Sequence, residues 1–211
     1  MKEDPEQIVF VVDDDESMRA ALTYLFKSMN LHVEVFTTAA AFLESELPNA
    51  ASCLVLDVRL PGINGLEFQE VLAKAGIHIP IVFMTGHGDI PMSVKAMKAG
   101  AIDFLPKPFR DQDMLDAVMR AFDQDRKRRT EEKTVSQLRH LYESLTRRER
   151  EVLTLVISGL MNKQIAHRLE VSEITVKIHR GNVMKKMEAR SFADLVRMAE
   201  TLGVKQAKAQ I

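Results

Sequence analysis

Five polar residues in the first half of the sequence stand at or just after the end of a short apolar run. They are Asp13, Asp14, Asp57, Thr85 and Lys107. Carboxylates held close together stay ionised only when a cation joins them, and oxygen ligands without His or Cys suit a hard ion such as Mg²⁺ or Mn²⁺. An aspartate beside such an ion can act as a nucleophile toward phosphorus, while a hydroxyl and an ammonium bind the remaining phosphoryl oxygens. These residue types predict a cation-dependent site for phosphoryl transfer.

The elements that must position this site are short β-branched runs that alternate with helical patterns. The runs are Ile8–Val12, Val33–Phe36, Cys53–Leu56, Ile79–Met84 and Ile102–Leu105. A weaker helical pattern covers Thr38 to Leu47. The alternation predicts an α/β fold with five parallel strands and helices on both faces, in which the first and third strands are central. Because parallel strands end at one edge of such a sheet, the five polar side chains are expected to converge there.

Charge divides the chain into two halves of opposite sign. Residues 1–125 contain 10 basic and 20 acidic side chains, whereas residues 126–211 contain 19 basic and 10 acidic ones. A basic half is suited to a polyanion such as DNA. The single cysteine, Cys53, excludes a disulfide framework and reads as a small buried hydrophobe. No apolar stretch reaches the roughly 20 residues that span a bilayer, and no apolar signal core is seen, so we expect a cytoplasmic protein.

Residues 126–144 form a charged segment between the halves. No Gly or Pro occurs from Phe109 to Ser158, although the apolar periodicity fades within this stretch. A helix that continues from the preceding one and a flexible charged tether both fit this composition.

The basic half is predicted to contain helices only. Thr146 and Glu149 have the spacing of a capping box, and Gly159 ends the helix that they begin. A second helix spans Asn162 to Leu169. A third begins after Ser172 and runs to about Met187, with an expected buried face of Ile174, Val176, Val183, Met184 and Met187. A fourth runs from about Ser191 to Thr201, and its apolar stripe fits either core packing or dimerisation.

The second and third of these helices, joined by a short turn, are typical of a helix-turn-helix. Its second helix presents basic residues at positions expected to be exposed, including Lys177, Arg180, Lys185 and Lys186. In such motifs the start of that helix reaches base edges, and the surrounding basic residues contact phosphates.

The acidic set carries a resemblance to a known family. Together with "LPGINGLE" after Asp57 and "KAMKAGAIDFLPKPF" around Lys107, it resembles the receiver domain of two-component response regulators over residues 7–125. The resemblance implies a flavodoxin-like or CheY-like fold and Asp57 as the phosphoacceptor. "TGHGDIPMSV" is similar to the FixJ branch in particular, and its His87 is read as an exposed loop residue.

The resemblance also implies further roles. The metal would be held by Asp14, Asp57 and the backbone carbonyl of Arg59, with Asp13 acting largely through water. Thr85 and Phe104 would form a switch pair, and Lys107 would bind the phosphate next to a cis Lys107–Pro108 bond. Asp15 is expected to cap the following helix and not to bind metal.

Residues 145–205 resemble the LuxR/NarL-type DNA-binding domain, in "LTRREREVL", "NKQIAHRL" and "SEITVKIHRGNVMKKM". By this resemblance Lys177 and Ile178 would face bases. Residues near the DNA backbone would be Lys163, Thr175, Arg180 and Lys185. Gly181 occupies a position where some relatives carry a long polar residue, so base reading there is open.

The two resemblances together imply a DNA-binding response regulator of the FixJ/NarL type. A sensor histidine kinase would phosphorylate Asp57, and phosphorylation would switch homodimerisation and binding to promoter DNA, with RNA polymerase as a further partner and no membrane. The protein would promote only its own phosphoryl transfer and dephosphorylation. One alternative is a Mg²⁺-dependent phosphohydrolase, although Arg59 stands where its second acid is needed. Another is a regulator with a vestigial pocket that binds DNA constitutively.

Overall fold

The computed structural model describes residues 7–86 and 90–205, which fall into two compact units divided between Arg129 and Thr130. His87 lies outside the described residues. No helix in the described ranges is both long and apolar enough to span a membrane. Each unit has its own hydrophobic core.

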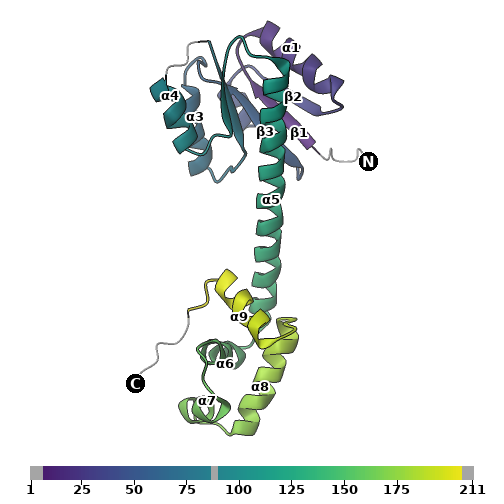
Figure 1. Cartoon of the computed structure of the whole chain (residues 1–211). Coiled ribbons are helices and arrows are strands. Elements are labelled where there is room, and N and C mark those ends of the chain that lie inside the picture. The colour runs from purple at the N-terminus through teal and green to yellow at the C-terminus, as the bar shows by residue number, and fades with distance from the viewer. Residues whose placement is uncertain (1–6, 87–89, 206–211) are drawn as a thin grey trace. The chain divides into compact units, whose positions relative to one another are not determined.

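A parallel five-stranded sheet forms the centre of the first unit (Figure 1). Its strands are β1 (Gln7–Val12), β2 (His32–Phe36), β3 (Ala51–Asp57), β4 (Ile81–Thr85) and β5 (Asp103–Pro106). The strand order is β2-β1-β3-β4-β5, which confirms the predicted fold and the internal position of β1 and β3. The order reverses between β1 and β3, so the crevice at this point of the sheet lies beside their carboxyl ends.

Helices cover both faces of the sheet because alternate strand residues point to opposite sides. On one face Phe10, Leu54 and Phe83 pack with α2 (Ala39–Leu43), α3 (Gly65–Lys74) and α4 (Ile90–Lys98). On the other face Val11, Cys53 and Val82 pack with α1 (Glu16–Ser28) and α5 (Asp111–Glu143). Cys53 is fully buried, and burial raises the pKa of its thiol. It is therefore a core residue, as predicted.

Several predicted boundaries in this unit differ from the structure, and two of the differences have a clear physical reason. The helix expected over Thr38 to Leu47 is the single short helix α2, because only Ala39 and Phe42 are buried while Leu43 and Leu47 stay exposed. The strand expected from Ile79 begins at Ile81, after Pro80. Proline has no N–H to give to a sheet ladder, which favours this later start.

The described residues of the second unit fold into helices. After the end of α5 these are α6 (Arg147–Ile157), α7 (Asn162–Leu169), α8 (Glu173–Lys186) and α9 (Phe192–Thr201). The capping box of Thr146 with Glu149 and the cap at Ser172 are both present, as predicted. Gly159 adopts a left-handed φ of 82° just after α6, a conformation that favours glycine.

The prediction that Ile174 is buried is wrong, because 73% of this residue is exposed. Val176 and Val183 form the buried stripe of α8, and Ile174 lies two residues before Val176, which places it on the opposite side of the helix. Ile178, one turn later, is 58% exposed on the same side. This exposed stripe runs beside Lys177.

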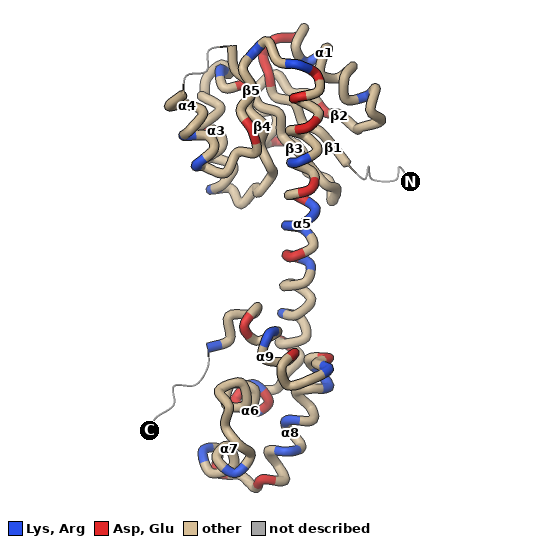
Figure 2. The backbone as a smooth tube through the Cα atoms, viewed as in Figure 1, with Lys and Arg blue, Asp and Glu red and all other residues tan. Residues whose placement is uncertain are grey.

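The charged segment 126–144 is helical up to Glu143, where α5 ends. Of the two alternatives that its composition left open, the structure has the helix. Both basic and acidic residues occur along α5 in Figure 2, and Arg126 pairs with Asp123 on its surface. Such exposed pairs support a solvated helix by a few tenths of a kcal/mol each.

The acidic pocket and the candidate DNA-binding surface

Three carboxylates meet at the carboxyl ends of β1 and β3. Oxygen atoms of Asp13, Asp14 and Asp57 all lie within 4.8 Å of one another. Lys107, which follows β5, places its Nζ 2.7 Å from Asp13 Oδ2 and 2.7 Å from Asp57 Oδ2. The structure therefore brings together four of the five polar side chains that the sequence suggested at this edge.

Burial and charge act against each other in this pocket. Asp13 is fully buried and Asp57 is 7% exposed, whereas Asp14 is exposed. Loss of water raises the pKa of Asp13, although hydrogen bonds from Lys107 and from the Asp15 N–H oppose the shift. Burial lowers the pKa of Lys107, but its bonds to the two carboxylates outweigh that effect and raise it. Three carboxyl groups thus meet one ammonium, which is bonded to two of them. The pocket therefore keeps an excess of negative charge.

The other predicted pocket residues lie on neighbouring strands and loops. Thr85 is fully buried at the end of β4, and its backbone carbonyl accepts a hydrogen bond of 2.7 Å from the Lys107 N–H. Phe104 is half-buried on β5, with its ring 6.2 Å from that of Phe83. The Arg59 N–H donates to Asp57 Oδ1 at 3.1 Å. The Lys107–Pro108 bond is cis, as predicted.

Local interactions explain why the chain bends as it does around the pocket. Asp15 is exposed, and its Oδ1 accepts from the N–H groups of Ser17 and Met18. This confirms Asp15 as the cap of α1. After β3, a Cβ at position 65 would lie 2.6 Å from the backbone oxygen of Asp57, a distance that real Cβ atoms do not reach. Gly65 therefore lets α3 start directly against the end of the strand that carries Asp57.

The candidate DNA-binding surface lies on α7 and α8. Lys163, Lys177 and Lys185 are exposed, Ile178 is largely exposed, and Thr175 and Arg180 are half-buried. Basic residues mark α8 in Figure 2. Arg180 Nη1 donates to Asn162 Oδ1 at 2.6 Å, which links α8 to the start of α7. The exposed residues of α8 are those that a helix in the major groove would present to bases and phosphates.

Sequence reasoning missed one buried acid in each unit. Asp125 on α5 is fully buried, where its carboxylate accepts from the Ser52 N–H at 2.9 Å and pairs with Arg128 and Arg129. Glu149 is 3% exposed and binds Lys186 at 2.7 Å, so Lys186 is not the free surface lysine that was expected. Only the capping-box spacing gave a signal for Glu149, and nothing in the sequence indicated its partner.

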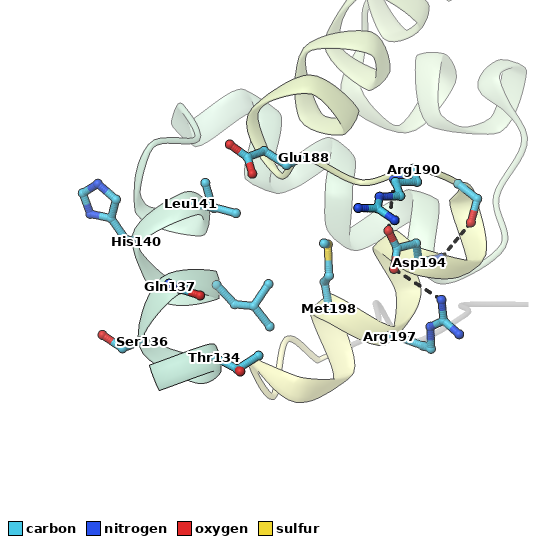
Figure 3. Close-up of a pocket in the computed structure, with 12 residues that line it drawn as sticks. Thr134, Ser136, Gln137, His140, Leu141, Glu188, Arg190, Asp194, Arg197 and Met198 are labelled. Atoms are coloured by element: carbon cyan, nitrogen blue, oxygen red, sulfur yellow. Dashed lines mark hydrogen bonds and ion pairs between the residues drawn. The ribbon is translucent and has the colours of Figure 1, made fainter. Parts of the chain in front are cut away.

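A cavity of about 980 Å³ lies in the second unit and not at the acidic pocket. It is an open groove between the last turns of α5 and α9 (Figure 3). Its acid Asp194 already accepts from the Arg190 N–H and from Arg197, while its own N–H donates to Ser191. The polar groups of Asp194 therefore already have partners within the protein. The size of the groove alone does not mark it as a functional site.

Comparison with known proteins agrees with this division of the chain. Residues 9–119 match the family described as response regulator receiver domain, and residues 143–199 match the luxR family of bacterial regulatory proteins. The chain belongs to the family of two-component response regulators that bind DNA through a luxR-type helix-turn-helix. It is a regulator of transcription and not a catalytic enzyme.

Individual relatives span nearly the whole chain. Nodulation protein W of Bradyrhizobium diazoefficiens is 61% identical over 93% of this chain and 87% of its own length. The transcriptional regulatory protein FixJ of Azorhizobium caulinodans is 44% identical over 95% of both chains. Among solved structures, the response regulator StyR has a TM-score of 0.82 at 52% identity, over 92% of this chain and 98% of its own.

Proposed function

We propose that Asp57 is the phosphoacceptor of this response regulator and that a sensor histidine kinase supplies the phosphoryl group. The observation that carries the proposal is the cluster of three carboxylates within 4.8 Å, faced by the single ammonium of Lys107. An oxygen of Asp57 would attack the phosphorus of a phosphohistidine, and the bond from nitrogen to phosphorus would break. Asp57 is the last residue of β3, and 7% of it is exposed.

The pocket fits a divalent cation, and Mg²⁺ or Mn²⁺ is the expected ion. Its side-chain donors are carboxylate oxygens, and the three carboxylates stand against one ammonium, which is bonded to Asp13 and Asp57. Asp13, Asp14, Asp57 and the backbone carbonyl of Arg59 are the proposed metal-binding groups. When bound, the ion would neutralise charge on the transferring phosphoryl group.

Phosphorylation adds a charge of about −1.5 to −2, which the protein must bind. Lys107 would exchange its bond to Asp57 for a bond to a phosphoryl oxygen, and Thr85 would donate its hydroxyl to another. Movement of Thr85 would leave space for the half-buried Phe104 to turn inward, which would reshape the face formed by α4 and β5. Val94 and Met97 of α4 are exposed, and we propose that this face forms a homodimer after phosphorylation.

The dimer would place two recognition helices on promoter DNA. Lys177 and Ile178 are proposed to read bases, while the proposed backbone contacts are Lys163, Thr175, Arg180 and Lys185. RNA polymerase is the expected further partner, and the cytoplasm is the expected location.

Labelling with acetyl phosphate and Mg²⁺ tests the phosphoacceptor. Asp57→Asn should take up no phosphoryl group in intact-mass measurements. Asp15→Asn is the matched control, because it removes a neighbouring carboxylate yet keeps the oxygen that caps α1. It should be labelled like the unmodified chain. Labelling of Asp57→Asn, or its loss in Asp15→Asn, would contradict the assignment.

A second experiment tests base reading. A binding site can be selected from random DNA with the full-length protein. Lys177→Ala should then reduce the ratio of specific to non-specific affinity by about tenfold or more, which corresponds to the loss of one good base contact. Unchanged discrimination would remove Lys177 from the base-reading set.

A further inference from the structure

An ion pair between a buried acid and a partly exposed lysine joins the end of α8 to the beginning of α6. Glu149 Oε2 lies 2.7 Å from Lys186 Nζ and also accepts from the Thr146 N–H at 2.8 Å. Glu149 is 3% exposed, and its pKa is lowered, because the bonds from Lys186 and Thr146 outweigh the effect of burial. The ammonium of Lys186 has three N–H donors, and its shortest hydrogen bond is made within the protein, to Glu149.

Lys185 and Lys186 are neighbours in the last turn of α8, but their surroundings differ. Lys185 is exposed, and the structure gives its ammonium no hydrogen bond or ion pair with any described residue. Lys186 is half-buried against α6. Adjacent residues on a helix point about 100° apart, and of these two it is Lys186 that lies against α6. The structure therefore separates a lysine free for DNA from one that is held by the protein.

Lys186 also reaches the turn that follows α5. Its Nζ lies 3.4 Å from the backbone oxygen of Ser144, a longer and weaker contact than the one to Glu149. Arg150 of α6 donates to the backbone oxygen of Glu143 at 2.9 Å and stands over the ring of Tyr142. Carbonyl groups at the end of a helix have no partner within the helix. Here side chains from α6 and α8 supply partners at the end of α5.

Apolar packing, the Arg180–Asn162 hydrogen bond and the Glu149–Lys186 ion pair together hold α8 against its neighbours. Its fully buried residues within the helix are Val176 and Val183, and apolar contacts have little directional preference. A charged hydrogen bond has a defined length and direction. Lys177 lies nine residues before Lys186, or about 13 Å along the axis at 1.5 Å per residue. A small rotation of the helix at Lys186 would thus move every side chain that faces DNA.

We propose that Glu149 and Lys186 form a positioning pair for the recognition helix. Lys186 does not bind DNA itself but fixes α8 against α6 and the α5–α6 turn, so that Lys177 and Ile178 reach base edges. The inference rests on the proposed role of α8 in reading DNA, and it adds two residues outside the proposed contact set.

The salt dependence of DNA binding separates positioning from contact. A lysine that neutralises a phosphate contributes about 0.9 to the slope of log affinity against log salt concentration. Lys185→Met should lower the slope by about that amount and weaken selected and random DNA alike. Lys186→Met should keep the slope of the unmodified protein and its affinity for random DNA. Its ratio of specific to non-specific affinity should fall by about tenfold, the loss of one base contact.

Two further variants guard against a simple folding defect. Lys186→Arg keeps a cation opposite Glu149 and should retain most of the discrimination. Glu149→Gln keeps an acceptor for the Thr146 N–H but removes the charge, so it should match Lys186→Met, and the double variant should lose little more. Circular dichroism of each variant checks the helical content. Discrimination that Lys186→Arg fails to restore would overturn the proposal.

The outcomes also distinguish this inference from the proposed function. A slope that falls by about 0.9 in Lys186→Met would make Lys186 a phosphate contact and overturn the positioning role. Discrimination lost in Lys177→Ala but kept in Lys186→Met would overturn the positioning role alone. A protein that selects no sequence from random DNA would overturn both the base-reading function and this inference.

Discussion

In each unit of the protein the Nζ atom of a lysine lies 2.7 Å from an oxygen of a buried carboxylate. In the first unit Lys107 forms ion pairs with Asp13 and Asp57, and the carboxylate of Asp14 lies close to both acids. Among the described residues of the second unit Glu149 is the one carboxylate bonded to Lys186, and it also accepts a hydrogen bond from the Thr146 N–H. The units differ in the number of charges: the pocket holds three carboxylates and one ammonium that is bonded to two of them, whereas the pair in the second unit has one carboxylate for one ammonium.

This difference gives the two acids opposite properties. The pKa of Asp13 is raised, because burial outweighs the help that it receives from Lys107. The pKa of Glu149 is lowered, because its hydrogen bonds outweigh burial. An acid in the first situation is stabilised by an added cation, while an acid in the second has nothing to gain from one. The same residue types therefore form a binding site in one unit and a structural contact in the other.

Replacing the two lysines should have the largest effect. Lys107→Met leaves Asp13 and Asp57 buried without a cation, which should cost the first unit about 3 kcal/mol in EDTA. Lys186→Met should cost the second unit about 1 kcal/mol, since Lys186 is partly exposed and screened by water. Saturating Mg²⁺ should restore much of the first loss and none of the second. Hydrogen exchange of amides in β1, β3, α6 and α8 measures each unit separately. A recovery in both units, or in neither, would contradict the comparison.

Neutralising an acid should have opposite signs in the two places. Glu149→Gln should destabilise the second unit by about 1 to 2 kcal/mol, because it removes a charged bond from a buried group. Asp14→Asn should make the first unit slightly more stable in EDTA, because it relieves repulsion among like charges. Mg²⁺ should then stabilise the unmodified chain more than Asp14→Asn. The same exchange measurement applies, and a loss of stability on Asp14→Asn in EDTA would show that the pocket holds no excess charge.

A smaller effect concerns pH. The folded pKa of Glu149 is lowered, so its carboxylate contributes fully above the ordinary glutamate value of about 4.5, and this contribution is lost as pH falls through the lower folded value. The stability difference between the unmodified chain and Glu149→Gln should therefore shrink from pH 6 to pH 3.

Tyrosine fluorescence can follow this difference in the second unit. The chain has two tyrosines and no tryptophan, and Tyr24 is 80% exposed. In a Tyr24→Phe background the signal comes from Tyr142, which lies in the second unit. Urea unfolding at several pH values then gives the difference in free energy. A difference that stays constant down to pH 3 would mean that the charge on Glu149 contributes nothing.

Much of the fold could be predicted because its determinants are local. Apolar runs predicted the five strands and the central position of the first and third, and spacing predicted the caps at Asp15, Thr146 and Ser172. The four residues that meet in the pocket could be predicted because parallel strands end at one edge of the sheet. Residues that directly follow different strands in the sequence therefore lie close together in the fold. The boundaries of α2 and β4 were less accurate, since there the pattern of large apolar residues was weak or interrupted by proline.

The features that could not be predicted depend on partners far apart in the sequence. Asp125 binds the backbone of Ser52, 73 residues away, and Glu149 binds Lys186, 37 residues away. In the sequence, Asp125 and Lys186 looked like members of charged surface runs. Ile174 looked like a core residue until the structure showed which side of α8 faces α6. Burial of a charged or apolar side chain near an element's end is decided by packing that the local pattern does not contain.

The central claim is that the excess negative charge of the pocket makes Asp57 a switch. Light scattering of the full 23.9 kDa chain tests it most directly, with beryllofluoride standing for the phosphoryl group. The mass should double only when Mg²⁺ and beryllofluoride are both present, and Asp57→Asn should remain a monomer under the same conditions. A mass that does not change with both ligands, or that doubles equally in Asp57→Asn, would contradict the claim.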